Sequence, residues 1–154
     1  MKCGRYAWTL VMAIGFAVVP HIARSQAAVQ LVEIRVVVNG VRNQKGSVIC
    51  SLWASAKSGA FTTVGTESHK ISVPIRNGQG VCEFKDLPAG AYAATVFHDE
   101  NGNGKFDQRF GYPLEGYGFS NNVNPTIRAP SFNHCEVQYS GKGVLVVPIN
   151  LIYR

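Results

Sequence analysis

The sequence predicts an all-β protein, an antiparallel β-sandwich of seven short strands with one long loop. Three observations predict this fold: apolar and polar residues alternate in short runs, turn signals separate the runs, and no stretch carries a convincing helical stripe. A strand of this kind has one dry face and one wet face. Two sheets that bury their dry faces against each other therefore make a stable protein.

The seven runs are separated by glycine, proline and asparagine turns. The first run alternates valine and isoleucine with Glu33 and Arg35, as an edge-type strand with one wet face does. Pro74 lacks a ladder donor, which places the third run at a sheet edge, and Asn77-Gly78 is a hairpin signal before the fourth run. The expected strands are residues 31–38, 47–53, 71–75, 80–84, 91–98, 134–139 and 144–153.

The first 27 residues are predicted to be a secretory signal peptide. Lys2 and Arg5 precede an apolar run over residues 7–19, and a small-residue cleavage site ends at Ala27. The run is too short for a transmembrane helix, and no later segment approaches one. An uncleaved N-terminal anchor is the rival interpretation. We therefore expect a single β-sandwich domain over residues 28–154, without a transmembrane segment, in the periplasm or secreted.

The charge pattern argues against a nucleic-acid surface. The chain carries a formal net charge of +6, and half of that charge leaves with the signal peptide. The remaining lysines and arginines are scattered, without a basic run or interleaved aromatic residues. The expected partner is an unknown ligand or protein, and no nucleic acid.

Export implies an oxidising compartment, so the cysteines after the signal peptide are disulfide candidates. Three remain, namely Cys50, Cys82 and Cys135, and three pairings are open to them. Cys50 and Cys82 lie in expected core strands, each flanked by alternating apolar residues, whereas Cys135 follows the long loop. We expect a disulfide between Cys50 and Cys82, with Cys135 free.

The segment after the fifth strand, DENGNGKFD, contains the pattern of a calcium loop. Oxygen-bearing side chains at alternate positions turn inward in a tightly curled loop, and glycine permits the sharp bend. Position twelve of the pattern holds Phe110 where a bidentate glutamate is usual, and Glu115 is the nearest replacement. The candidate calcium ligands are Asp99, Asn101, Asn103, the Lys105 carbonyl, Asp107 and Glu115.

Linked turns are the alternative interpretation of the same loop, with the carboxylates solvated or accepting backbone N–H groups. His98, beside the loop, is a candidate metal ligand or base, but a hydrogen bond to a loop carbonyl is the favoured role. The nearby aromatic residues are expected to pack under the loop, with a carbohydrate or peptide platform as the alternative. These aromatic residues are Phe106, Phe110, Tyr112, Tyr117 and Phe119.

Catalysis has little support in the sequence, and no catalytic residue is assigned. The chain has no nucleophile elbow, no zincin pair and no phosphate loop followed by a helix. His134 and Cys135 are neighbours on an expected strand and would point to opposite faces. The sequence predicts a non-enzymatic binding or structural module. A small secreted enzyme with its site on residues 98–122 is the alternative.

Four ordered motifs carry a family resemblance. They are LPAGAYA at residues 87–93, HDENGNGKFD at 98–107, GYPLEGYGFSNN at 111–122 and APSF at 129–132. With them the chain resembles, over nearly all of residues 32–153, the secreted bacterial family called domain of unknown function twenty-one forty-one. The resemblance implies a prealbumin-like or Ig-like β-sandwich exported by Gram-negative bacteria, and no biochemical activity. This chain is about one residue shorter than the family pattern after Asp107, which affects the reach of Glu115.

Overall fold

The computed structural model describes residues 32–154, and these residues are mainly β-strands. The signal peptide expected in residues 1–27 lies outside the described residues. The all-β expectation is confirmed. The seven expected runs correspond to β1 (Glu33–Asn39), β2 (Ser47–Ala54), β3 (His69–Pro74), β4 (Gly80–Lys85), β5 (Gly90–Asp99), β9 (Glu136–Tyr139) and β10 (Val144–Asn150).

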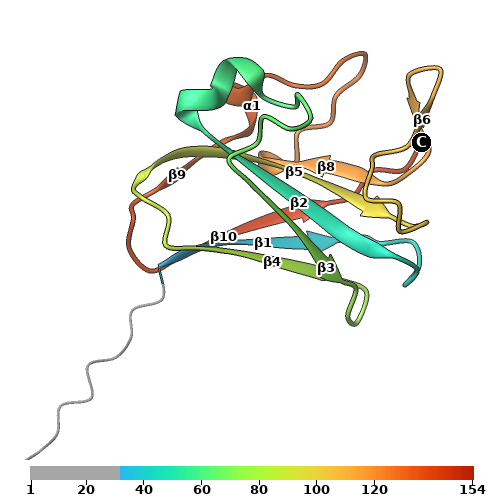
Figure 1. Ribbon diagram of the computed structural model, residues 1–154, viewed down its shortest axis with the longest axis horizontal. Helices are drawn as coiled ribbons and strands as arrows, with labels where there is room; N and C mark the ends of the chain where they lie inside the picture. The colour runs from blue at the N-terminus through green and yellow to red at the C-terminus, as the bar shows by residue number, and fades with distance from the viewer. Residues whose placement is uncertain (1–31) are drawn as a thin grey trace, which may run out of the picture.

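Two sheets pack face to face around a shared core (Figure 1). The smaller sheet has the order β10-β1-β4, and the larger has the order β3-β2-β5-β8, with β9 also paired to β5. On β1, Ile34, Val36 and Val38 are fully buried against the larger sheet, as the alternating pattern requires. The residues that predicted the strands are therefore the residues that form the core.

The disulfide expected between Cys50 and Cys82 is present and links β2 to β4, one strand from each sheet. The two Cα atoms lie 6.4 Å apart. Within residues 32–154, Cys135 is the free cysteine, and it is buried. The bridge therefore crosses the core, where it joins the two layers of the fold.

The prediction of antiparallel pairing throughout is wrong for one pair. β1 and β10 run parallel, in register from Glu33 opposite Val144 to Asn39 opposite Asn150. β1 is also a central strand, because it lies between β10 and β4. Alternation of apolar and polar residues is the same in parallel and antiparallel strands, so the sequence pattern does not encode the direction of pairing.

The long loop contains more regular structure than the sequence predicts. It includes the short strands β6 (Gln108–Arg109), β7 (Tyr112–Pro113) and β8 (Tyr117–Phe119), followed by the 3-10 turn η2 (Ser120–Asn122). A further 3-10 segment, η1 (Ser55–Ala60), follows β2. β8 pairs with the long strand β5, which provides the edge that orders this part of the loop.

The strand expected over residues 134–139 is wrong in its first residues, which form the single-turn helix α1 (Phe132–Cys135). Helical spacing of three residues turns both Phe132 and Cys135 into a second core cluster on the outer side of the larger sheet. His134 is exposed and its Nδ1 lies 3.1 Å from the Ser131 hydroxyl, so it faces away from the buried Cys135 thiol. Burial raises the pKa of that thiol to about 11, which makes it a poor nucleophile.

Two local expectations about turns and edges are confirmed. Asn77 and Gly78 have φ values of +51° and +76°, and the flanking residues Arg76 and Gln79 form a bridge, as in an Asn-Gly hairpin. Strand β3, which ends at Pro74, is the edge of its sheet. Local turn chemistry alone therefore predicts this corner of the fold.

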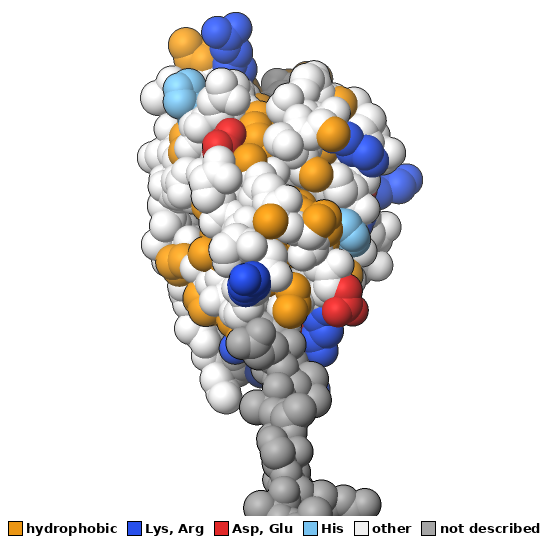
Figure 2. All heavy atoms as spheres, turned by 90° about the vertical axis from the view of Figure 1, so that its left-hand side faces the viewer, with side chains coloured by type: hydrophobic (Ala, Val, Ile, Leu, Met, Phe, Trp, Pro, Cys, Tyr) orange, Lys and Arg blue, Asp and Glu red, His pale blue; other side chains and the backbone are white. Residues whose placement is uncertain are grey.

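On the face drawn in Figure 2, lysine and arginine side chains are dispersed among uncharged polar and hydrophobic groups. No single basic patch is visible on that face. In the part of the chain that the structure describes, no helix is long and apolar enough to cross a membrane.

Candidate functional site

The loop from Asp99 to Asp107 joins the end of β5 to the β6–β7 hairpin, on the right in Figure 1. Asp99 is only 2% exposed, and both of its carboxylate oxygens accept backbone hydrogen bonds. Oδ1 accepts the Asn103 N–H at 3.0 Å, and Oδ2 accepts the Gly104 N–H at 2.8 Å. Gly102 and Gly104 have φ values of +72° and +74°, which glycine adopts without strain. The loop therefore curls around the Asp99 carboxylate.

Side-chain contacts gather other predicted ligands around Asp107. The Asn101 and Asn103 amide groups both donate to Asp107 Oδ2, at 2.7 and 2.9 Å. Their oxygens accept the backbone N–H groups of Asn103 and Lys105, at 3.0 and 2.7 Å. The bonds to backbone N–H groups are the local turn contacts that the alternative interpretation expects. The bonds to Asp107 are not local turn contacts, and they bring three predicted ligands together.

Glu115 reaches this loop and spans its two ends. Its Oε1 accepts the Glu100 N–H and its Oε2 accepts the Asp107 N–H, each at 3.1 Å, and the residue is 4% exposed. Phe110, at position twelve of the calcium pattern, is 90% exposed with a φ of +52° at the tip of the β6–β7 hairpin. The hairpin thus turns position twelve outward and returns Glu115 to the loop.

The electrostatic environment of Glu115 is unfavourable for its ionised form. Burial raises the pKa of this carboxyl, hydrogen bonds from the Asp107 and Glu100 N–H groups oppose the rise, and the charges of Asp107 and Asp99 add to it. Because the folded pKa lies above the unfolded value, folding favours the protonated form. Ionised Glu115 therefore costs stability at neutral pH, and a nearby cation would remove that cost.

His98 has the structural role that the sequence analysis favours. It is fully buried, and its Nε2 lies 2.8 Å from the Lys45 carbonyl oxygen, which requires a hydrogen on Nε2. Its other ring nitrogen, Nδ1, lies 2.8 Å from the Tyr153 hydroxyl oxygen. Arg42 stacks on the Tyr153 ring and pairs with Glu100 at 2.6 Å. These contacts hold the end of β5 from which the loop begins.

The carboxylates of the loop would not be enough to hold a metal ion without other oxygen ligands. Within residues 32–154, no group of three or more His, Cys, Asp or Glu side chains is placed so as to hold a metal ion by itself. Calcium also takes amide and backbone carbonyl oxygens, which this loop offers at Asn101, Asn103 and Lys105. The donor set suits a hard cation that accepts mixed oxygen ligands, and it suits Zn²⁺ poorly.

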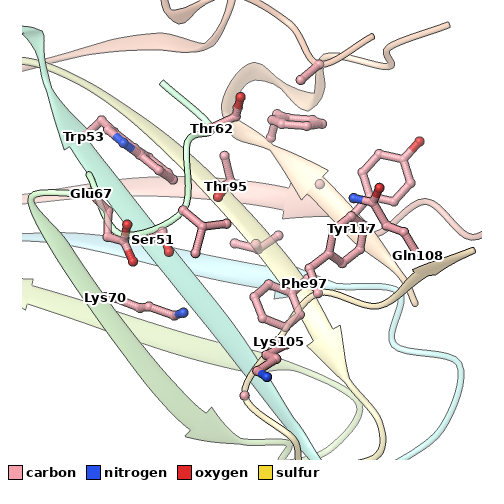
Figure 3. Close-up of a pocket in the computed structure, with 17 residues that line it drawn as sticks. Ser51, Trp53, Thr62, Glu67, Lys70, Thr95, Phe97, Lys105, Gln108 and Tyr117 are labelled. Atoms are coloured by element: carbon pink, nitrogen blue, oxygen red, sulfur yellow. The ribbon is translucent and has the colours of Figure 1, made fainter. Parts of the chain in front are cut away.

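A cavity of about 510 Å³ lies beside the loop and contains residues that the sequence analysis does not single out. Its floor is the outer face of the larger sheet, its first wall is Gly104–Phe106 of the loop, and its second wall includes Thr62, Val64 and Glu67 (Figure 3). The floor residues come from β2, β5 and β8; they are Ser51, Trp53, Thr95, Phe97, Tyr117 and Phe119.

The outward side chains of β2 carry the sequence signal for this cavity. Ile49 and Trp53 face away from the shared core, yet they are only 4% and 3% exposed. A strand that is apolar on both faces predicts a second layer over the outer face. The aromatic residues of the loop divide accordingly: Phe106, Tyr117 and Phe119 join the second cluster, whereas Phe110 and Tyr112 are exposed.

Comparison with known families supports the resemblance noted in the sequence. The family model described as uncharacterized protein conserved in bacteria (DUF2141) matches residues 36–146. The chain belongs to this family. The matched segment extends from β1 into β10 and includes both the loop and the cavity. No curated protein and no solved structure matches the chain, so its function is argued from the site.

Proposed function

We propose that this protein is an exported, non-enzymatic binding module whose 99–107 loop is ordered by calcium. The observation that carries the proposal is that one loop curls around the Asp99 carboxylate and binds both Asp107 and the distant Glu115 through hydrogen bonds. Among the described residues, the carboxylates do not form an ion site by themselves, and the asparagine amide oxygens and the Lys105 carbonyl of the same curl would complete the shell. Carboxylates brought together repel each other, and the raised pKa of Glu115 reflects burial and this repulsion. A divalent cation between them would relieve the repulsion.

The residues that would hold the ion are Asp99, Asn101, Asn103, Asp107 and Glu115, with the Lys105 carbonyl and water. The two asparagine amides now donate to Asp107. A bound cation would replace those two hydrogen bonds, with the amide oxygens turned toward it. Only three of these ligands bring charge, so we expect weak binding, with a Kd on the order of 10⁻⁴–10⁻³ M.

The loop is connected to the proposed binding role through the cavity. Residues Gly104–Phe106, in the middle of the curl, form one wall of the cavity, and Phe106 packs on Phe97 and Tyr117 with ring centroids 5.6 and 5.8 Å apart. Ordering the loop with calcium would therefore order a wall of the binding site. In this role calcium would stabilise the structure of the binding site and would take part in no catalytic step.

Isothermal titration of the purified protein with calcium and with magnesium tests the proposal. We expect calcium to bind in the range above and magnesium to bind more weakly, because magnesium demands octahedral geometry and releases water reluctantly. Asp107→Asn should lower calcium affinity at least about tenfold. Glu83→Gln, which removes an exposed carboxylate on the smaller sheet, should leave it unchanged. Absence of calcium binding at about 10 mM would mean that turn contacts alone hold the loop.

Export and the finer fold class belong to the same proposal. The Cys50–Cys82 bridge between the sheets supports an oxidising compartment, and an inter-sheet bridge also supports the Ig-like class of sandwich. Intact mass of protein recovered from the periplasm or medium should correspond to a chain that begins near Ala28. A full-length mass in the membrane fraction would contradict the cleaved signal peptide.

A further inference from the structure

The β6–β7 hairpin has an apolar face that the described residues leave open to solvent. Phe110, Tyr112 and Leu114 are 90%, 73% and 53% exposed. Tyr112 lies opposite Arg109 across the hairpin, and the Leu114 N–H donates to the Asp107 carbonyl at 3.0 Å, which continues the same pairing. Side chains two positions apart on a strand point to the same side, so Tyr112 and Leu114 share one side with Arg109. These three residues and Phe110 form the hairpin face.

The opposite side of the hairpin is directed toward the rest of the protein. Gln108, which lies opposite Pro113, lines the cavity beside the 99–107 loop, whereas the apolar residues of the hairpin face do not line it. In Figure 1 the hairpin stands away from the two sheets, at the upper right. The hairpin face therefore lies on a projection of the surface, which can enter a partner but cannot enclose one.

The backbone at the tip of the hairpin holds Phe110 in a strained conformation. Phe110 and Gly111 are the two central residues of the turn, with φ values of +52° and +81°. Asparagine and glycine are favoured in such a turn, whereas a bulky side chain at positive φ is strained. The Arg109 guanidinium lies 5.6 Å from the centroid of the Phe110 ring, and the ring is otherwise exposed. Because strained residues concentrate at functional sites, an exposed phenylalanine here indicates a function for the tip.

The free charge beside the hairpin face is positive. Lys105 and Arg109 are exposed, and neither forms an ion pair in the part of the chain that the structure describes. The two half-buried carboxylates of the adjoining loop are engaged, because Asp107 accepts two asparagine amides and Glu100 pairs with Arg42 at 2.6 Å. Free cations next to apolar and aromatic side chains complement a surface with anionic headgroups over an apolar interior.

The small size of the hairpin face favours a membrane over a protein partner. A stable protein interface buries about 800 Å² on each partner and involves about 20–30 residues of each. The hairpin face has only four residues, and they lie on one narrow projection. A bilayer needs no matching shape, and a few apolar side chains are enough when basic residues add electrostatic attraction. Tyrosine and arginine suit this boundary, because each has an apolar body and a polar end.

We propose that the hairpin face docks this protein on a phospholipid membrane that contains anionic lipids. Phe110 and Leu114 enter the edge of the acyl region, Tyr112 lies at the level of the headgroups, and Lys105 and Arg109 contact the lipid phosphates. This inference rests on the proposed export, which would bring the protein to a membrane surface outside the cytoplasm. It requires neither calcium nor a ligand in the cavity.

Co-sedimentation with lipid vesicles in chelator tests the docking, with the protein as recovered from the periplasm or medium. One set of vesicles contains phosphatidylcholine alone, and the other contains about 30% phosphatidylglycerol. We expect binding to the anionic vesicles to be at least about tenfold tighter than binding to the neutral ones, because two free cations contribute. Equal binding to both sets would overturn the inference. No binding to the anionic vesicles, as expected if a protein were the partner, would also overturn it.

Phe110→Asn is the decisive variant, because asparagine tolerates positive φ and the variant should melt no lower than the wild type. Loss of the phenyl group should weaken binding to anionic vesicles about tenfold to a hundredfold. Val146→Thr removes an apolar side chain that is 53% exposed on the smaller sheet, and it should bind as the wild type does. Unchanged binding by Phe110→Asn, or equal weakening in the two variants, would overturn the inference.

Arg109→Gln separates the charge of the hairpin face from its apolar contacts. It should weaken binding to anionic vesicles about fivefold and leave binding to neutral vesicles unchanged. Lys142→Gln removes the same charge from the turn between β9 and β10, at the left of Figure 1, and should change neither. Equal effects of these two variants would mean that net charge alone attracts the protein, which would contradict docking by the hairpin face. Vesicle binding in chelator tests this inference, and calcium titration without vesicles tests the proposed calcium site, so either can fail alone.

Discussion

Replacing Asp99 with alanine separates the hydrogen-bonding role of this carboxylate from its proposed metal-binding role. In chelator the variant loses the bonds to the Asn103 and Gly104 N–H groups. The Asn103 N–H also donates to Asn101 Oδ1 at 3.0 Å, so only the Gly104 N–H is left without an acceptor. One hydrogen bond to a charged group is worth about 1.5–3 kcal/mol. For a unit of about 120 residues this lowers Tm by about 6–12 °C.

Calcium should increase the difference in unfolding free energy between the wild type and Asp99→Ala. At about a hundred times its Kd, calcium adds about 2.7 kcal/mol to the free energy of unfolding of the wild type, or about 11 °C in Tm. Asp99→Ala removes a buried charged ligand and should gain almost nothing. The difference in unfolding free energy should therefore grow from about 1.5–3 kcal/mol in chelator to about 4–6 kcal/mol in calcium.

Thermal melts followed by far-UV circular dichroism measure both quantities, in chelator and in calcium at about a hundred times its Kd, which is roughly 10–100 mM. Glu83→Ala removes an exposed carboxylate from the other sheet and should follow the wild type in its response to calcium. An equal calcium shift in wild type and Asp99→Ala would refute metal binding at this residue. Equal melting temperatures in chelator would refute the hydrogen-bond reasoning.

Three further predictions concern the disulfide, a glycine and pH. A Cys50→Ala/Cys82→Ala variant should lose about 3.7 kcal/mol, because the bridge spans 32 residues, and equal denaturant midpoints would contradict this. Gly46→Ala should lose about 3 kcal/mol, because a Cβ there lies 1.8 Å from the Asp99 carbonyl oxygen at a φ of +66°. Gly143 is the matched control, because it has a φ of +65° and open space around it. Gly143→Ala should lose only the stability that a left-handed backbone costs an alanine, and an equal loss of stability in Gly46→Ala and Gly143→Ala would rule out the clash. In chelator, the wild type should gain stability relative to Glu115→Gln as the pH falls from 7 toward 4.5, because the pKa of Glu115 is higher in the folded protein than in the unfolded chain. A difference between the two denaturant midpoints that does not change with pH would contradict this.

The sequence by itself determined the elements whose signals are local. Alternation predicts the core positions of β1 and β4, because a strand exposes successive side chains to opposite faces. The Asn77-Gly78 turn follows from the positive φ that both residues tolerate. The curl of the 99–107 loop likewise follows from glycine and from side chains that accept nearby N–H groups. In each case the interacting atoms are close along the chain.

Only the tertiary structure decided the features that join distant segments. The last strand, β10, pairs in parallel with β1. The alternation of apolar and polar residues is the same for parallel and antiparallel pairs, so it predicts neither the partner strand nor the direction of pairing. Glu115 reaches the loop because the β6–β7 hairpin turns Phe110 outward, a geometry that residue spacing does not encode. The cavity is lined by residues of β2, β5, β8 and two loops, which are far apart in the sequence. Trp53 and Glu67 therefore line the same cavity only once the strands have paired.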